Sequence, residues 1–307
     1  MTRTPITTTL AAAVVLMALC ATARSQHDQW RNTVRKLASR GPAEKTQAII
    51  GRGVAAGDAE WLYLAALSAC LEGDGQTALR HAHAAVEAGL PLARLQAGPR
   101  DAFAPLHDLA AYREWAVTQE DELLHGPLLG KVTGTSAAFW VRTADEVEVS
   151  VELHPVKSDR DADLRTAKTK TSAGEDYTGI IDVDGLQPDT AYTYRVLLDG
   201  KAASEAATFR TYPRQGSPGR FRVGFGGGAG YVPAHEHMWN TIADLAPRAF
   251  LLLGDNVYID DPGHPLTQRY CYYRRQSRPE WQRFAAATSI YAIYDDHDFG
   301  TADCVPG

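Results

Sequence analysis

The sequence predicts a multidomain protein with an all-helical part, then a small β-sandwich, then the start of an α/β domain. Three patterns indicate this order. Residues 27–123 carry alanine-rich segments with helical periodicity, and residues 125–213 alternate apolar and polar side chains with a period of two. From residue 220 onward, apolar strands alternate with amphipathic helices. A chain of 307 residues is long enough for two or three hydrophobic cores.

Residues 1–25 have the pattern of an export signal. Arg3 supplies a positive charge, and residues 10–21 form an apolar stretch that is too short to span a bilayer. Small residues before Ser25 provide a cleavage site for signal peptidase. We therefore expect a secreted or periplasmic protein, with no membrane span elsewhere in the chain.

The net charge of -6 makes the protein acidic and limits the partners it would bind. Without a basic run, the chain has no electrostatic reason to form a stable complex with nucleic acid. It could still act on phosphates if metal ions supplied positive charge. Cys70, Cys271 and Cys304 lie beyond the predicted signal, and two interpretations stay open: a Cys271–Cys304 disulfide, or three buried thiols.

The helical part is predicted to consist of hairpins. Asp58 is a candidate N-cap for a helix over 58–72, and a second helix over 76–89 ends at Gly89. The segments VAAG (54–57) and VEAG (86–89) end successive helices at a spacing near the ~34-residue period of tetratricopeptide repeats, which this part resembles. A closing helix is expected over 103–115. We interpret the part as an interaction or packing module with an unidentified partner.

The second part contains the segment LQPDTAYTYRVLLDG (186–200), which resembles a conserved stretch of fibronectin type III domains. In such a domain Pro188 would lie in a turn, and Tyr192 or Tyr194 would form the tyrosine-corner hydrogen bond. This resemblance implies a fibronectin III-like β-sandwich over 125–213 and indicates little about function.

The third part is predicted to have strands over 221–227, 248–258 and 289–300, separated by helical segments. Open α/β sheets bind ligands at the carboxyl ends of their strands. Two polar clusters follow strands here, GDNVY (254–258) and DDHD (295–298). Crowded carboxylates with a histidine suit hard or borderline metal ions. Alternatively, the first cluster is only a turn at Gly254, and the second is a solvated loop or a helix N-cap.

The longer motifs GDNVYID and YDDHDFG resemble the metal motifs of the alkaline phosphatase D-like (PhoD-like) metallophosphatases, which belong to the calcineurin-like phosphoesterase superfamily. The order of signal, sandwich and α/β part is also similar, over about residues 125–307. The resemblance implies a metallophosphatase domain over 220–307. It also implies hydrolysis of a small phosphate ester or phosphodiester by metal-bound hydroxide.

The resemblance also implies roles for individual residues. Asp255 is similar to the carboxylate that bridges two metals, and Tyr258 to a phenolate ligand of iron(III). Asp296 matches a ligand of the second metal, calcium in this family, and Asp295 would assist it. His297 resembles the histidine that contacts the substrate or donates a proton to the leaving group.

Two further residues complete the predicted site: Asp298 would orient His297, and Asn256 would line the site.

The sequence departs from the family's pattern at one iron ligand. The family commonly has a cysteine ligand after the first strand, and Gly228 stands there in this sequence, so the first metal is expected to be held differently. The glycines of FGGG (225–228) would either bring backbone N–H groups to a phosphate or form a tight turn.

The family also uses histidines from a downstream segment that has no counterpart up to Gly307. We therefore interpret the α/β part as truncated, with apolar sheet faces left exposed and without full metal affinity or activity. Two alternatives to a two-metal phosphoesterase stay open. One is a secreted, non-catalytic adaptor with a degenerate phosphatase domain. The other is a hydrolase with one divalent ion, which metal stoichiometry would distinguish.

Overall fold

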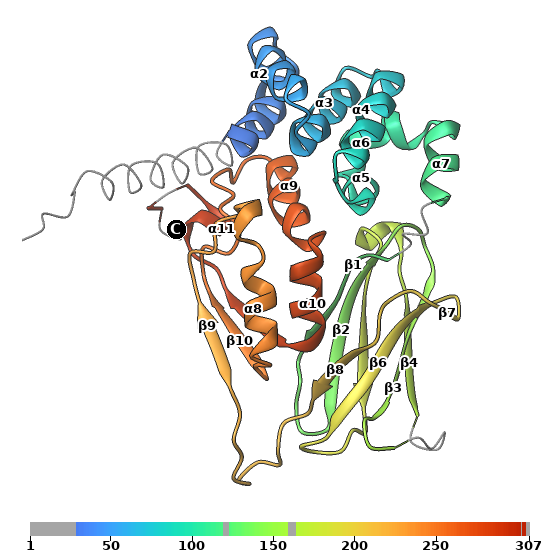
Figure 1. Cartoon of the computed structure of the whole chain (residues 1–307), viewed down its shortest axis with the longest axis vertical. Helices are drawn as coiled ribbons and strands as arrows, with labels where there is room; N and C mark the ends of the chain where they lie inside the picture. The colour runs from blue at the N-terminus through green and yellow to red at the C-terminus, as the bar shows by residue number, and fades with distance from the viewer. Residues whose placement is uncertain (1–28, 119–122, 159–163, 302, 305–307) are drawn as a thin grey trace, which may run out of the picture.

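A computed structural model describes the chain outside its first 28 residues and a few short segments; the described residues are 29–118, 123–158, 164–301 and 303–304. Helices come first, a two-sheet sandwich follows, and a small parallel sheet with its helices comes last (Figure 1). The predicted signal at 1–25 lies outside the described residues. No helix within these ranges is long and apolar enough to cross a membrane.

The helical part begins with helical residues 29–40. It continues with α2 (Glu44–Ala55), α3 (Ala59–Leu71), α4 (Gly75–Glu87), α5 (Leu92–Ala97), α6 (Arg100–His107) and α7 (Ala110–Val117). The predicted N-cap is confirmed, because Asp58 accepts hydrogen bonds from the backbone N–H groups of Glu60 and Trp61, both at 3.0 Å. The prediction of one closing helix over 103–115 is wrong, since α6 ends at His107 and a separate helix, α7, begins at Ala110. The likeness to tetratricopeptide repeats stays a prediction.

The sandwich has one sheet in the order β1-β2-β5 and a second in the order β4-β3-β6-β7, with β8 also paired to β6. Its strands are β1 (Leu123–Gly130), β2 (Ser136–Thr143), β3 (Glu148–Pro155), β4 (Arg165–Lys170), β5 (Thr178–Asp184), β6 (Ala191–Leu198), β7 (Lys201–Ala202) and β8 (Ala207–Arg210). Alternate residues such as Phe139, Val151 and Val196 point inward and form its core. The closer likeness to fibronectin type III domains stays a prediction.

The two candidate corner tyrosines on β6 have different partners. The Tyr192 hydroxyl accepts a hydrogen bond from the backbone N–H of Gln187 at 2.8 Å, within the sandwich. The Tyr194 hydroxyl donates to the carbonyl of Ala286 at 2.8 Å, and Ala286 belongs to the third part of the chain. Tyr194 therefore joins the sandwich to the α/β part.

The α/β part has a parallel sheet in the order β11-β10-β9. Its elements are β9 (Val223–Gly226), α8 (Met238–Asp244), β10 (Ala249–Leu253), α9 (Pro265–Gln276), α10 (Pro279–Ala287), β11 (Ser289–Ile293) and α11 (Asp296–Phe299). Helices α8 and α10 cover one face of the sheet (Figure 1). On this face Trp239 of α8 and Phe284 of α10 pack on Phe250 of β10.

The opposite face of this sheet is open to solvent, as the sequence predicts for half of a two-layered core. Phe225 is 73% exposed and Ile293 60% exposed, and Leu251 is also exposed. The strand predicted over 248–258 is shorter in the structure. That strand ends at Leu253 and buries one face only.

One hydrophobic core crosses from the helical part into the α/β part. It contains residues of α3 and α4 together with Val257, Ile259, Tyr270 and Cys271 from the far end of the sequence. Cys271 and Cys304 are free thiols in the structure, as is Cys70, whose burial raises the pKa of the thiol to about 12. The interpretation as three buried thiols therefore describes Cys70 and Cys271, whereas Cys304 is a free thiol that is partly exposed.

Candidate metal centre

Two loops follow neighbouring parallel strands and meet at one edge of the sheet. Leu253 at the end of β10 lies opposite Ile293 at the end of β11. The residues that follow β10, 254–261, are called the metal loop here, and the residues that follow β11 lead directly into α11. The parallel register therefore brings the two predicted polar clusters together.

The metal loop begins with a turn that only glycine fits. Gly254 has φ +97°, and a Cβ at this position would lie 2.6 Å from the Cβ of Asp295. Three non-glycine residues of the loop, Asp255, Tyr258 and Asp260, also have positive φ angles of 52° to 53°. Such conformations are costly and are frequent at functional sites.

Asp255, Asp296 and His297 lie together in the described part of the chain as a group that could hold a metal ion, called the metal-ligand cluster below. Each offers one donor atom, and these atoms lie within 4.8 Å of one another. The Tyr258 hydroxyl donates to Oδ2 of Asp255 at 3.1 Å. Oδ1 of Asp255 is buried and has no hydrogen-bond partner. A buried carboxylate oxygen without a partner is costly unless a cation or a donor compensates it.

Asn256 contributes a second buried oxygen without a partner. Its Nδ2 donates to the carbonyl of Ile293 at 2.8 Å and to Oδ2 of Asp298 at 3.0 Å. These bonds orient the amide, and its Oδ1 is left buried and unpaired. Adjacent unpaired carboxylate and amide oxygens are ligands that hard cations prefer.

Asp298 does not orient His297, contrary to the sequence prediction. The Asp298 carboxylate is 8% exposed and accepts from the backbone N–H groups of Asn256 and Val257 at 2.6 and 3.1 Å. These hydrogen bonds fix the start of the metal loop. The carboxylate beside His297 belongs to Asp260, whose Oδ1 hydrogen-bonds to Nδ1 of the imidazole.

Asp260 is a site residue that the sequence reasoning missed. Its signal was its position within the GDNVYID motif, two residues after Tyr258. It could not be distinguished from a solvated loop aspartate without the contact to His297, which comes from the other cluster.

Asp295 caps α11 and lies outside the three-residue cluster. Its side chain accepts from the backbone N–H of Asp296 at 2.9 Å and forms a capping box with Asp298. The helix N-cap alternative for DDHD therefore describes Asp295 and Asp298, whereas Asp296 and His297 face the cluster.

His297 lies in a negatively charged environment. Burial opposes its protonation, but the hydrogen bond and charge of Asp260, with the charges of Asp255 and Asp296, raise the pKa of the imidazole above its ordinary value. The His297 and Tyr258 rings lie with centroids 4.5 Å apart. The imidazole is thus held by contacts on two sides.

The glycine run after β9 passes directly beside Tyr258. The N–H of Gly228 donates to the carbonyl of Gly254 at 3.2 Å, and the N–H of Gly230 donates to the carbonyl of Gly228 at 2.9 Å. These bonds favour the tight-turn interpretation over a phosphate cradle. A Cβ on Gly228 would lie 3.5 Å from the Tyr258 hydroxyl, so this position borders the cluster without supplying a ligand.

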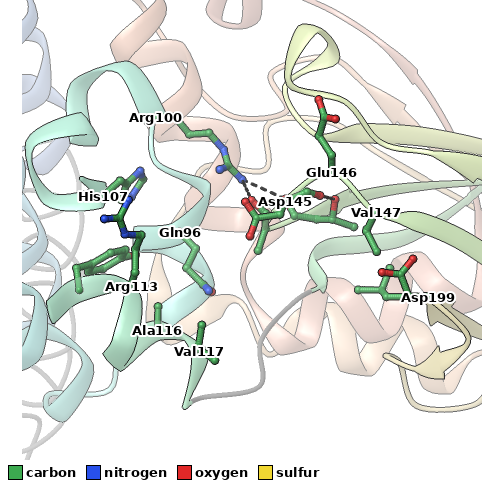
Figure 2. Close-up of a pocket in the computed structure, with 14 residues that line it drawn as sticks. Gln96, Arg100, His107, Arg113, Ala116, Val117, Asp145, Glu146, Val147 and Asp199 are labelled. Atoms are coloured by element: carbon green, nitrogen blue, oxygen red, sulfur yellow. Dashed lines mark hydrogen bonds between the residues drawn. The ribbon is translucent and has the colours of Figure 1, made fainter. Parts of the chain in front are cut away.

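A separate pocket of about 430 Å³ lies where helices α5, α6 and α7 face the sandwich (Figure 2). Arg100 crosses it and donates to the carbonyls of Thr143 and Ala144 at 3.1 and 2.7 Å. Asp145 and Asp199 line the opposite wall. None of the residues of the metal-ligand cluster lines this pocket.

Comparisons with known proteins give the chain phosphatase-like relatives. A family profile described as a domain of unknown function (DUF7800) matches residues 120–216, which is under half of the chain. An acid phosphatase from Aspergillus ficuum is 36% identical over 84 residues, corresponding to 26% of this chain and 14% of that protein.

Two solved structures show partial likeness. The structure of PhoD matches 55% of this chain and 38% of its own length, at 18% identity and a TM-score of 0.47. The sensor domain of the anti-sigma factor RsgI4 from Pseudobacteroides cellulosolvens matches 29% of this chain, at 18% identity and a TM-score of 0.24. Both TM-scores are too low to establish a common fold. The chain spans less than half the length of the acid phosphatase and of PhoD.

Proposed function

We propose that the chain carries part of the active site of a secreted or periplasmic, metal-dependent phosphoesterase. The observation that carries the proposal is the convergence of Asp255, Asp296 and His297 at the ends of two parallel strands, with the buried Oδ1 of Asp255 unpaired. The relative named as an acid phosphatase supports the same class of reaction.

The donor set fits a metal centre. Asp255 and Asp296 would be its carboxylate ligands, and the Tyr258 phenol and Asn256 amide would supply further oxygens. Asp295 would assist by holding Asp296 at the start of α11. Carboxylate and phenolate oxygens suit iron(III) and calcium, the ions that the motif resemblance implies. A bound metal would supply a water of lowered pKa and would stabilise negative charge on a phosphoryl oxygen.

His297 would act on the substrate side of the centre. Its Nδ1 hydrogen-bonds to Asp260, which fixes the ring and leaves Nε2 to face a phosphate ester. From there it would contact the phosphoryl group or donate a proton to the leaving oxygen of a monoester or diester.

A non-catalytic adaptor is the alternative, and one observation favours it. Gly228 offers no side chain beside Tyr258, where a cysteine ligand is common in the family that the motifs resemble. The strained backbone of the metal loop favours the catalytic proposal, because a site without function has no reason to retain such a cost.

The test combines metal analysis with hydrolysis assays on the full-length protein. p-Nitrophenyl phosphate and bis-p-nitrophenyl phosphate would compare monoester with diester turnover. Asp255→Ala should lose both bound metal and turnover. The matched control is Asp244→Ala, which removes an exposed carboxylate paired with Arg283 and should leave both unchanged.

Each result of this experiment has a defined meaning. Two metal ions per chain with turnover support the two-metal phosphoesterase, and one ion per chain supports a single-ion hydrolase. Absence of bound metal and of turnover, with iron, calcium and other divalent ions added, would refute the proposal and leave the adaptor. N-terminal sequencing of the exported protein tests secretion, and a mature chain that starts near residue 26 is expected.

A further inference from the structure

We propose that the helical part of the chain, residues 29–117, positions the metal loop, and that Arg31 is a positioning residue that acts on His297 through Asp260. This inference rests on the proposed function for its catalytic meaning. Its structural basis is a set of contacts between segments at opposite ends of the sequence.

Arg31 reaches the metal loop directly. Its Nη1 donates to the carbonyl oxygen of Tyr258 at 3.0 Å, although 227 sequence positions separate the two residues. The same guanidinium forms an ion pair with Oδ2 of Asp260. The two side chains are 13% and 18% exposed, so water screens this pair only partly.

Asp260 connects Arg31 to His297 because its two oxygens have different partners. Oδ2 pairs with Arg31, and Oδ1 hydrogen-bonds to Nδ1 of His297. With both oxygens engaged, the carboxylate has one orientation, and the imidazole ring is fixed with it. Arg31 therefore constrains His297 without touching it, which is how outer groups position a reacting side chain.

The helix that carries Arg31 is itself anchored. Its neighbours Trp30 and Val34 are buried in the core shared by the helical and α/β parts. Arg31 therefore extends to the loop from a helix that is already packed in place. An arginine on an exposed, mobile side chain would lose more conformational entropy on forming the same ion pair.

The apolar side of the metal loop packs on the same core. Val257 and Ile259 are 5% and 4% exposed and belong to the cluster that contains residues of α3 and α4. Their polar neighbours Tyr258 and Asp260 instead engage Asp255, Arg31 and His297. The apolar residues of the loop therefore pack on the helical part, and the polar residues between them contact the candidate site.

The helical part also holds α9, which follows the metal loop. Tyr270 of α9 packs against Tyr63 of α3, with ring centroids 6.0 Å apart. Arg269 pairs with Asp101 of α6 at 3.0 Å. The loop is thereby supported along its length and at the element that follows it. The helical part thus packs on the elements that carry the candidate site of the same chain.

The test compares Arg31→Gln with Arg35→Gln, which removes an exposed arginine from the same helical segment. Hydrogen exchange of the amides at 255–261, measured on the full chain without added metal, reports the loop independently of activity. We expect about tenfold faster exchange in Arg31→Gln, because a hydrogen bond to a charged group is lost, and no change in Arg35→Gln. Arg31→Lys, which keeps the charge, should exchange at an intermediate rate.

The catalytic consequence is tested on the full-length protein by comparing kcat for two substrates that differ in their leaving group. If Arg31 positions His297 as a proton donor, Arg31→Gln should lower kcat about tenfold more for phenyl phosphate than for p-nitrophenyl phosphate, because the poorer leaving group needs the proton more. KM should change little. In an Asp260→Asn background, Arg31→Gln should add no further change to the leaving-group ratio, because the route to His297 is already cut, whereas loop exchange should still rise through the lost bond to the Tyr258 carbonyl.

The outcomes separate this inference from the proposed function. Faster exchange without any phosphatase activity supports the positioning role and refutes the function. Equal exchange in Arg31→Gln and Arg35→Gln, with an unchanged leaving-group ratio, overturns the positioning role even in an active enzyme. If Arg31→Gln unfolds the whole chain, Arg31→Lys and Asp260→Asn take its place, and unchanged exchange in both overturns the inference.

Discussion

Asp298 connects the two loops of the candidate site, and its replacement should cost far more stability than its short helix suggests. Its carboxylate accepts from the backbone N–H groups of Asn256, Val257 and Asp295, and from the side-chain amide of Asn256. The distances run from 2.6 to 3.2 Å. Asp298→Ala would leave the three backbone donors without this acceptor in a largely buried place, whereas the Asn256 amide keeps its bond to the Ile293 carbonyl.

The expected magnitude follows from that geometry. A buried donor left unsatisfied costs ~1–3 kcal/mol, and charged acceptors lie at the upper end. Water would compensate the N–H of the exposed Asp295, and the Asn256 side-chain amide keeps the Ile293 carbonyl, which leaves the backbone N–H groups of Asn256 and Val257 uncompensated. We therefore expect Asp298→Ala to lower the free energy of unfolding by about 3–5 kcal/mol. Asp295→Ala removes one exposed cap and should cost about 1 kcal/mol.

The assay is urea denaturation followed by tryptophan fluorescence, with the midpoint and the slope compared between variants. Asp298→Asn adds a second criterion, because it keeps the shape but places an NH₂ group against donors. It should lose about 2 kcal/mol of stability. A cost for Asp298→Ala no larger than that for Asp295→Ala would refute the structural role. Lost turnover in Asp298→Asn with unchanged stability would restore the histidine-orienting role.

Three further predictions follow from the structure. Gly254→Ala should cost about 2–4 kcal/mol in thermal or urea unfolding, because φ is +97° and the new Cβ would lie 2.6 Å from that of Asp295. Tyr194→Phe should cost about 1–2 kcal/mol in urea unfolding, because it removes the 2.8 Å bond to the buried carbonyl of Ala286. The melting temperature should fall as pH drops below about 6.5, the ordinary histidine value, because burial and nearby arginine charge hold the pKa of His125 well below it.

The sign of the pH effect follows from proton binding. Below about pH 6.5 unfolded His125 binds a proton that the folded form does not, so stability is complete above this pH and falls by up to about 1.4 kcal/mol per unit below it. In the fold its Nδ1 accepts from Arg142 at 3.1 Å, and its Nε2 lies 2.9 Å from the Ser277 hydroxyl. His125→Gln should flatten the profile between pH 5 and 6.5. An unchanged profile in that variant would assign the effect to other groups.

The other two predictions have their own contrary results. Wild-type stability in Gly254→Ala would mean that the two loops can separate without cost. Additive effects of Tyr194→Phe and a second substitution in α10 would show that the sandwich and the α/β part are not coupled through this bond.

Local patterns in the sequence were sufficient for some elements of the site. Gly254 was predicted as a sharp turn after an apolar strand, and the structure shows a backbone conformation there that favours glycine. Asp255 and Asp296 were placed at the carboxyl ends of neighbouring strands, where parallel pairing brings them together. These predictions depend on chain direction and strand order, which the periodicity of side chains already encodes.

The choice of partners within the site could not be predicted in this way. Asp298 and Asp260 are both aspartates beside a motif residue, and nothing local distinguishes the one that holds the loop from the one that contacts His297. Arg31 lies in a segment whose pattern indicates only a helix. Its contact with the metal loop exists because the helical part shares a core with Val257 and Ile259.

The sequence by itself determined the order of the three parts, the turn at Gly254 and the gathering of acidic residues at one sheet edge. The tertiary structure alone decided that Asp260 engages His297, that Asp298 supports the metal loop, and that Arg31 reaches across the chain to Asp260 and the Tyr258 carbonyl. The physical reason is range. Periodicity and turn chemistry act over a few residues, whereas the partner of a buried charge is set by which distant surfaces pack together and exclude water.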